Sequence, residues 1–159
     1  MKFFTIGVYN STEKEFFDKL VNNKIDTFCD IRQRRSVRGP KYPFANSTRL
    51  QAKLEQLGIN YEYVTGLAPT SEIRNIQKKI DAEKHESASE RQQMGQAFKA
   101  EYRKQIISKF DFENFFNILH ELGAKNIVLF CVEEKAEACH RSLVTQVLNE
   151  KHGYKIKHL

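Results

Sequence analysis

Apolar residues in the chain fall into short runs, separated by longer segments with the spacing of amphipathic helices. The strand-like runs lie at residues 3–8, 25–31, 59–64, 127–132 and 154–159. Strands that alternate with helices are typical of parallel β-α-β units in one open sheet. Right-handed crossovers then place the C-terminal ends of the strands along one edge, where α/β proteins usually bind their ligands.

The helical segments carry end signals as well as apolar stripes. Thr12 and Glu15 have the spacing of a capping box, Asp111 is placed to cap a helix rich in phenylalanine, and Gly58 is placed to end a leucine stripe. These patterns predict helices at about residues 11–21, 46–58, 111–123 and 138–151.

The segment from about residue 70 to 109 breaks this alternation. It is long and polar, and its apolar residues predict two helices, one with Ile73, Ile76 and Ile80 on a face. We interpret it as a helical insertion that covers one side of the sheet, with a lid or an oligomer surface as alternatives. The prediction is a single α/β domain over residues 1–159, with a mostly parallel open sheet of about five strands and helices on both faces.

Composition fits a folded domain. The chain has 159 residues, of which 40% are hydrophobic and 29% are charged, so it is long enough to bury a core and is not disordered in composition. The longest apolar run is too short to span a bilayer, and the N-terminus lacks a signal-peptide cleavage site. Three cysteines form no disulfide framework and favour a reducing, cytoplasmic setting.

Positive charge is concentrated in one predicted loop. The net charge is +6, and residues 32–41, "RQRRSVRGPK", hold five cations and no acid: Arg32, Arg34, Arg35, Arg38 and Lys41. Such a cluster attracts phosphate or carboxylate groups. The alternative is a solvated basic loop without a ligand.

The stretch "VLFCVEEKAEACHRSL", residues 128–143, gathers several reactive side chains. Cys131 ends the fourth strand and Glu133 follows it, while Cys139 and His140 lie near the start of the last helix. The N-terminus of a helix favours anions and lowers the pKa of a nearby thiol, which makes Cys139 a candidate nucleophile. Cys131 has two interpretations, a reactive thiol or a buried apolar residue.

Arg141 also lies at the start of this last helix. Its guanidinium has the planar fork that binds a carboxylate or a phosphate in a bidentate way, so we interpret it as an anion clamp. In the alternative interpretation, Arg141 only pairs with Glu133 or Glu134 and closes the loop between them.

The second strand ends with "CDIRQRR", in which Asp30 and Arg32 alternate and therefore point to the same face. A carboxylate beside an arginine can orient a substrate or accept a proton. A structural ion pair between neighbouring strands is the alternative. Polar side chains follow two separate strands at the edge where the basic loop begins, so the functional interpretation is favoured.

Zinc ligation is a further possibility for Cys131, Cys139 and His140. However, the spacing C-x7-C-H matches no standard zinc motif, and adjacent cysteine and histidine side chains at a helix start are expected to point in different directions. We therefore expect neither a metal nor another cofactor.

Several segments together resemble the domain of unknown function 488 family: "FTIG", "DIR", "LGINYEYV", "LFCVEEKAEACHRSLV" and the terminal "HL". The resemblance covers essentially the whole chain and implies an α/β domain whose activity is not established. It also implies a set of polar site positions, namely Asp30, Arg32, Cys131, Glu133, Cys139, His140, Arg141 and His158.

This chain departs from the family pattern in two places. Family members often have "IGHS" near the first strand, where this chain has "IGVYN", so Val8 or Tyr9 takes the place of the histidine. The proline and serine pattern after "DIR" is replaced by Arg34, Arg35 and Arg38, which fits a different or larger anionic substrate.

Three functions are compatible with these residues. The favoured one is an enzyme that acts on a phosphate-bearing substrate, either a nucleotide or a nucleic-acid end. Its catalytic groups would be Asp30, Cys131, Glu133, Cys139 and His140, and its substrate-binding groups Arg32, Arg34, Arg35, Arg38, Arg141 and His158. The alternatives are a non-catalytic nucleic-acid-binding module that stacks bases on Tyr42 or Phe44, and a redox or metal protein that uses its cysteines. The oligomeric state is left open.

Overall fold

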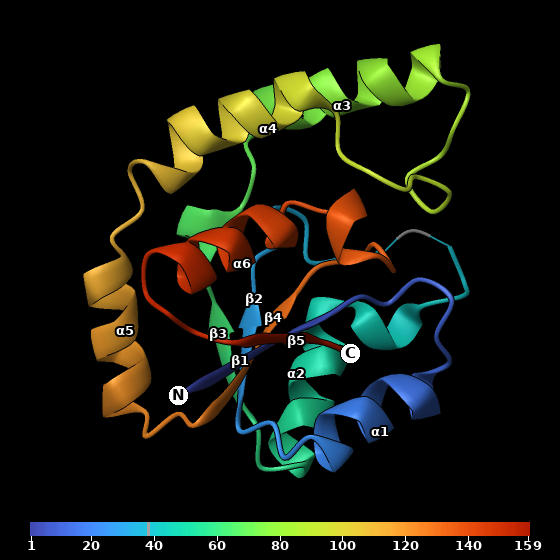
Figure 1. The fold of residues 1–159 in the computed structure, drawn as a ribbon. Helices are drawn as coiled ribbons and strands as arrows, with labels where there is room; N and C mark the ends of the chain where they lie inside the picture. Colours follow the sequence, from blue (N-terminus) through green and yellow to red (C-terminus); the bar gives the residue numbers. More distant parts are fainter. Residues whose placement is uncertain (38) are drawn as a thin grey trace.

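Five parallel strands form a single sheet in the computed structural model, which describes residues 1–37 and 39–159 (Figure 1). The order across the sheet is β3-β2-β4-β1-β5, and every paired strand is parallel to its neighbour. The strands are β1 (Lys2–Ile6), β2 (Thr27–Asp30), β3 (Asn60–Tyr63), β4 (Asn126–Phe130) and β5 (Ile156–His158). Each one falls within or overlaps a run predicted from the sequence, so the predicted α/β class is confirmed.

Six α-helices connect and cover these strands: α1 (Glu13–Asn22), α2 (Ser47–Gln56), α3 (Ser71–Glu83), α4 (Gln96–Tyr102), α5 (Phe112–Glu121) and α6 (Arg141–Glu150). Two predicted N-terminal caps are present. Thr12 and Glu15 form the capping box of α1, and the Asp111 side chain accepts a hydrogen bond from the Asn114 N–H at the start of α5. A π-helical turn, Arg103–Ile107, continues α4.

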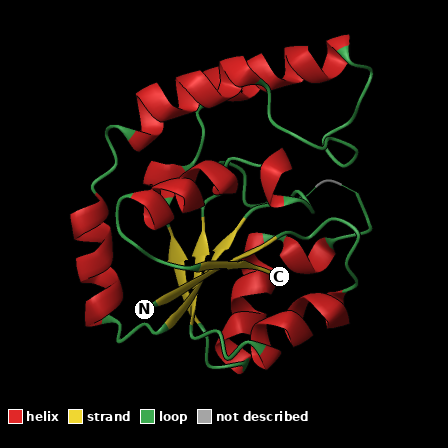
Figure 2. Cartoon of the chain, viewed as in Figure 1, coloured by secondary structure: helices red, strands yellow, loops and turns green. Residues whose placement is uncertain are grey.

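The helices divide between the two faces of the sheet (Figure 2). On one face, Phe16 of α1 and Leu50 of α2 pack in a cluster with Phe28 and Phe130 of the strands. On the other face, a second cluster joins residues of α3 to α6 to the strands, among them Ile73, Phe98, Leu119, Val144 and Leu129. Helices cover both faces, as the sequence predicted.

The segment predicted as a helical insertion contains α3 and α4, which contact each other and lie on the side of α6 remote from the sheet (Figure 1). The connection between them returns to the body of the domain, where the Met94 N–H donates to the carbonyl of Glu137 at 3.1 Å. This contact brings the connection next to the loop that follows β4.

The loops that follow β1 and β4 lie in direct contact. The N–H groups of Val8 and Tyr9 both donate to the carbonyl of Val132, at 3.1 and 3.0 Å. A Cβ atom at Gly7 would lie 1.9 Å from the Glu133 carbonyl oxygen, so only glycine allows this approach. The C-terminal edge of the sheet is therefore closely packed at β1 and β4.

None of the described helices is long and apolar enough to cross a membrane.

Candidate functional site

A cavity of about 610 Å³ opens at the C-terminal edge of the sheet. Tyr9, Arg32 and Cys131, from the segments that follow β1, β2 and β4, line one side of it, and residues of α3, α4 and their connection line the other. Of the two residues in the loop after β1, Val8 is buried and Tyr9 lines the cavity. The insertion thus supplies part of the cavity wall and does not serve only as a structural cover.

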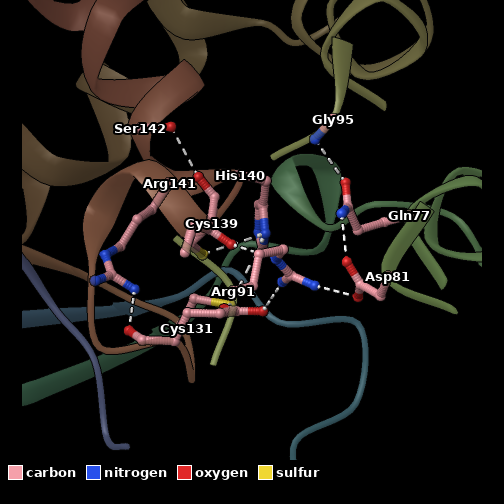
Figure 3. Close-up of polar contacts among 11 residues, drawn as sticks. Gln77, Asp81, Arg91, Gly95, Cys131, Cys139, His140, Arg141 and Ser142 are labelled. Atoms are coloured by element: carbon pink, nitrogen blue, oxygen red, sulfur yellow. Dashed lines mark hydrogen bonds and ion pairs between the residues drawn. The ribbon is translucent and has the colours of Figure 1, made fainter. Parts of the chain in front are cut away.

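Three reactive side chains, Cys131, Glu133 and His140, form the floor of this cavity. The Cys131 thiol donates to Oε2 of Glu133 at 3.2 Å. Nδ1 of His140 lies 3.8 Å from Sγ of Cys131 and 3.6 Å from Sγ of Cys139 (Figure 3). Cys139 is fully buried behind the other groups and does not line the cavity.

His140 is held in place from the opposite side of its ring. Nε2 lies 3.0 Å from the carbonyl oxygen of Ile31, and because a carbonyl only accepts hydrogen bonds, Nε2 is the donor. The ring also packs against Tyr102, with 5.4 Å between the centroids. Nδ1 is therefore the ring atom that faces the two sulfur atoms.

The expectation that Cys139 and His140 point in different directions is wrong. Cys139 has an extended backbone (φ −137°, ψ 149°), whereas His140 is already helical (φ −59°, ψ −19°) and is the N-cap of α6. The chain turns between the two residues, so both side chains point to Cys131. The three ligand-type atoms lie within 4.8 Å of one another.

Arg91, in the connection between α3 and α4, is one of the cavity residues that the sequence did not indicate. It is buried, and its guanidinium donates to Asp81 at 2.7 Å, to Glu133 at 2.8 Å and to the carbonyl of Ala138 at 3.0 Å. Gln77 extends the network by donating to Asp81 at 2.6 Å (Figure 3). A single arginine thus joins the insertion to the floor of the cavity, and it lies in a polar segment with no pattern that marks it.

The ionisation of the floor groups follows from burial and from their mutual contacts. Burial raises the pKa of Glu133 to about 7, and Cys139 adds to this effect, although Arg91 and His140 act in the opposite direction. Burial also raises the pKa of Cys131, as do its contacts with Cys139 and Glu133.

Cys139 and His140 shift each other's ionisation. Burial opposes the ionisation of Cys139, but the thiol of Cys131 and the positive charges of His140 and Arg141 outweigh it and lower its pKa. Burial lowers the pKa of His140, but its contacts with Cys139 and Glu133 outweigh burial and raise it. The pair therefore favours a thiolate next to an imidazolium when no metal is bound.

Four cations lie around the cavity above this floor: Arg34, Lys41, Arg74 and Lys78. We call these residues the cationic rim. Arg34, Lys41 and Lys78 are exposed, and Arg74 is half-buried. Across residues 1–37 and 39–159, none of the four forms an ion pair with a carboxylate. Burial lowers the pKa of Arg74, and the nearby Arg34 lowers it further, so the two guanidinium groups repel each other.

Asp30 and Arg32 form a buried ion pair at the end of β2. Oδ1 of Asp30 accepts from Nε of Arg32 at 2.8 Å, and Oδ2 accepts from NH2 at 2.7 Å. Oδ2 also accepts from the Tyr61 hydroxyl at 2.9 Å, while the third guanidinium nitrogen donates to the carbonyl of Ala45. Asp30 is fully buried and is not among the residues that line the cavity. This geometry supports a structural role for the pair, although the pair forms at the end of β2 and not between neighbouring strands as the alternative had it.

Arg141 is likewise occupied by the protein itself. Its two terminal nitrogens donate to the carbonyls of Glu133 and Glu134, at 2.6 and 2.7 Å, and the residue is 1% exposed. It does not line the cavity. The structure therefore supports the loop-closing alternative for Arg141, with main-chain carbonyls as partners instead of the expected carboxylates.

The other predicted binding residues lie in different places. Arg35 stacks over the ring of Tyr63 at 4.3 Å and is not part of the cavity wall. His158 lies on the edge strand β5, where Nδ1 contacts the Thr5 hydroxyl at 2.7 Å, and it also lies outside the cavity. Arg38 lies outside the described residues. Of the predicted site residues, the structure brings Arg32, Arg34, Cys131, Glu133 and His140 together around the cavity, with Cys139 beneath them.

A comparison with known proteins identifies the family of the chain. The sequence profile of the family described as "Domain of unknown function DUF488" matches residues 12–148, which covers most of the chain. No curated protein and no solved structure shows significant similarity to the chain. The match includes β2, β4 and the start of α6, which position the floor of the cavity. The chain therefore belongs to the DUF488 family.

Proposed function

We propose that this protein is an enzyme that acts on a phosphate-bearing substrate, a nucleotide or a nucleic-acid end, bound in the cavity at the C-terminal edge of the sheet. The observation that carries the proposal is the arrangement of the cavity. A cationic rim without carboxylate partners among the described residues lies above a floor of thiol, carboxylate and imidazole groups.

The cationic rim supports an anionic ligand. Arg34 is close enough to Arg74 to disfavour the positive charge of Arg74, and a phosphate between the two would relieve this repulsion. Arginine also binds phosphate oxygens through two parallel hydrogen bonds. The two acids of the cavity wall, Asp81 and Glu133, both pair with Arg91, and neither forms an ion pair with the rim.

The floor supports catalysis more than binding alone. A concave site with convergent titratable groups is typical of an active site. We propose that Cys131, Glu133 and His140 contact the reacting atoms of the substrate. The cationic rim then binds the phosphate groups of the substrate. A module that binds nucleic acid by stacking is supported less well, because Phe44 is buried in the core and Tyr42 is only 7% exposed.

Ligand-linked stability tests the anion site. ATP is expected to raise the free energy of unfolding of the wild-type protein, whereas adenosine, which lacks the phosphates, is not. The triple variant Arg34→Gln, Arg74→Gln, Lys78→Gln is expected to lose most of the ATP effect. Arg49→Gln is the matched control, because Arg49 is an exposed arginine on α2, pairs with Glu13 and is not part of the cavity. An ATP effect that is unchanged in the triple variant would contradict the proposal.

Turnover tests the enzymatic part. The wild-type protein should convert at least one substrate in a panel of nucleotides, phosphate esters and oligonucleotides with phosphorylated ends, and Glu133→Gln should abolish the activity while ATP binding persists. Phosphate-dependent binding that weakens steeply with salt, without turnover of any member of the panel, would favour the non-catalytic binding module instead.

A further inference from the structure

We propose that Cys131, Cys139 and His140 bind a zinc ion whose fourth coordination position opens into the cavity. The choice of these ligands depends only on their geometry. The role of the ion in the reaction deepens the proposed function and rests on it, since a zinc ion at the floor would polarise the phosphate group that the rim binds.

The two nitrogen–sulfur distances in this cluster are close to those of a tetrahedral zinc site. Zinc lies about 2.3 Å from a thiolate sulfur and about 2.0–2.1 Å from an imidazole nitrogen, so sulfur and nitrogen ligands are about 3.6 Å apart at tetrahedral angles. In this protein Nδ1 of His140 lies 3.6 Å from Sγ of Cys139 and 3.8 Å from Sγ of Cys131. The ligands are therefore arranged for the ion before it binds.

The orientation of His140 supports the same conclusion. A histidine that binds a metal through one nitrogen usually donates a hydrogen bond from the other nitrogen to a carboxylate or a main-chain carbonyl. Nε2 of His140 donates to the carbonyl of Ile31 at 3.0 Å, so Nδ1 can present its lone pair to a metal between the two sulfur atoms. The close contact with the ring of Tyr102 fixes the imidazole further.

The surroundings of the three ligands indicate an open site. Cys139 is completely buried, whereas Cys131 and His140 line the cavity, so the unfilled coordination position faces the cavity. Glu133 lies beside this position, because its Oε2 accepts from Cys131 at 3.2 Å while Arg91 binds its Oε1. Three protein ligands and one open position are the arrangement of catalytic zinc sites, and two sulfurs with one nitrogen favour zinc over magnesium or calcium.

Zinc binding to the full chain tests the proposal directly. The protein is stripped with a chelator under reducing conditions, zinc chloride is added alone, and bound zinc is measured by elemental analysis after gel filtration. We expect one zinc ion per wild-type chain. In Cys139→Ser the zinc affinity should be at least about 100-fold weaker, because removing a direct ligand should cost at least as much affinity as removing a residue that only supports a ligand. Cys29→Ala is the matched control, because it removes the buried thiol that lies outside the cluster.

Cobalt gives an independent readout of the ligands. The wild-type protein should show a thiolate-to-cobalt charge-transfer band that weakens in both Cys131→Ser and Cys139→Ser and persists in Cys29→Ala. Sub-stoichiometric zinc in the folded wild type, or a disulfide between Cys131 and Cys139 that forms in its place, would overturn the proposal.

The two proposals fail separately. The zinc measurement contains no phosphate, and the rim variant Arg34→Gln, Arg74→Gln, Lys78→Gln changes none of the three ligands. A protein that binds zinc but shows no ATP-linked stabilisation would lose the proposed substrate and keep the metal site. A protein that is stabilised by ATP but binds no zinc would lose the metal site and keep the proposed substrate.

Discussion

Two neighbouring strands, β2 and β4, both lead into ionisable side chains. The two sets of side chains differ in how fully the protein itself satisfies their hydrogen bonds. At the end of β2, both carboxylate oxygens of Asp30 accept hydrogen bonds from Arg32, and Oδ2 also accepts one from Tyr61. Beyond the end of β4, the sulfur of Cys131, Nδ1 of His140 and Oε2 of Glu133 contact mainly one another beside a cavity.

The number of hydrogen bonds that a polar side chain already makes distinguishes a structural role from a functional role better than the residue type does. Asp30 accepts four hydrogen bonds, two at each carboxylate oxygen, so it has no capacity left for a ligand, and its ion pair stabilises the fold only while both partners remain. Thiol and imidazole groups that face a cavity retain unused capacity, which a metal or a substrate can occupy. Arg32 and His140 both lie near this edge, yet we assign a structural role to Arg32 and a functional role to His140.

Removal of Asp30 should have the largest effect on stability. Asp30→Ala leaves the guanidinium of Arg32 buried without its partner, so the free energy of unfolding should fall by about 3–5 kcal/mol. Chemical denaturation measures the loss. The control is Asp18→Ala, which removes an exposed carboxylate paired with Lys14 on α1 and should cost less than about 1 kcal/mol. A stable Asp30→Ala protein that no longer converts substrate would give Asp30 the catalytic role instead.

Arg141→Lys distinguishes the two interpretations of Arg141. Lysine cannot donate to the carbonyls of Glu133 and Glu134 with the planar fork of arginine, so the free energy of unfolding should fall by about 1.5–3 kcal/mol. The increase in stability on adding ATP should stay the same, because Arg141 lies outside the cavity. If stability were unchanged and the ATP effect were lost, Arg141 would be the anion clamp that the sequence suggested.

Tyr61→Phe should have a smaller, pH-dependent effect. Its hydroxyl donates to Oδ2 of Asp30 at 2.9 Å, and its loss should lower stability by about 0.5–1.5 kcal/mol near neutral pH. Burial raises the pKa of Tyr61 to about 12, and the charge of Asp30 adds to this effect.

The direction of the pH dependence follows from this raised pKa. The folded state favours the neutral phenol, so the contribution of Tyr61 is fully present below the unfolded pKa of about 10 and is lost as the pH rises through about 12. Denaturation curves of the wild type and Tyr61→Phe should therefore approach each other in alkaline solution. A difference that grows with pH would show that the phenol is not held in its neutral form by folding.

The fold could be predicted because local pattern and tertiary burial agree. The run at residues 127–132 reads as a strand and forms β4 at the centre of the sheet, where its residues are buried on both faces. The caps Thr12 and Asp111 need only their own helix to form, so their spacing in the sequence was sufficient.

From the sequence, the site could be placed at the C-terminal edge of the sheet, but its detailed arrangement could not be predicted. The C-terminal ends of parallel strands meet by topology, and this brought Arg32, Cys131 and His140 to one cavity. The convergence of Cys139 and His140 depends on a single backbone turn, which no spacing rule describes. Arg91 contacts Glu133 across 42 positions of sequence, and a contact at that range leaves no periodic signal.

The central claim is that the cavity beyond β4 is the place where a phosphate-bearing ligand binds. The chain has two methionines, and they make a built-in comparison: Met94 lines the cavity, and Met1 precedes β1 at the opposite end of the strands. With ¹³C-labelled methionine methyl groups, titration with ATP should shift the Met94 resonance and leave that of Met1 in place, while adenosine should shift neither. A Met94 resonance that stays unchanged at ATP concentrations that stabilise the protein would contradict the claim.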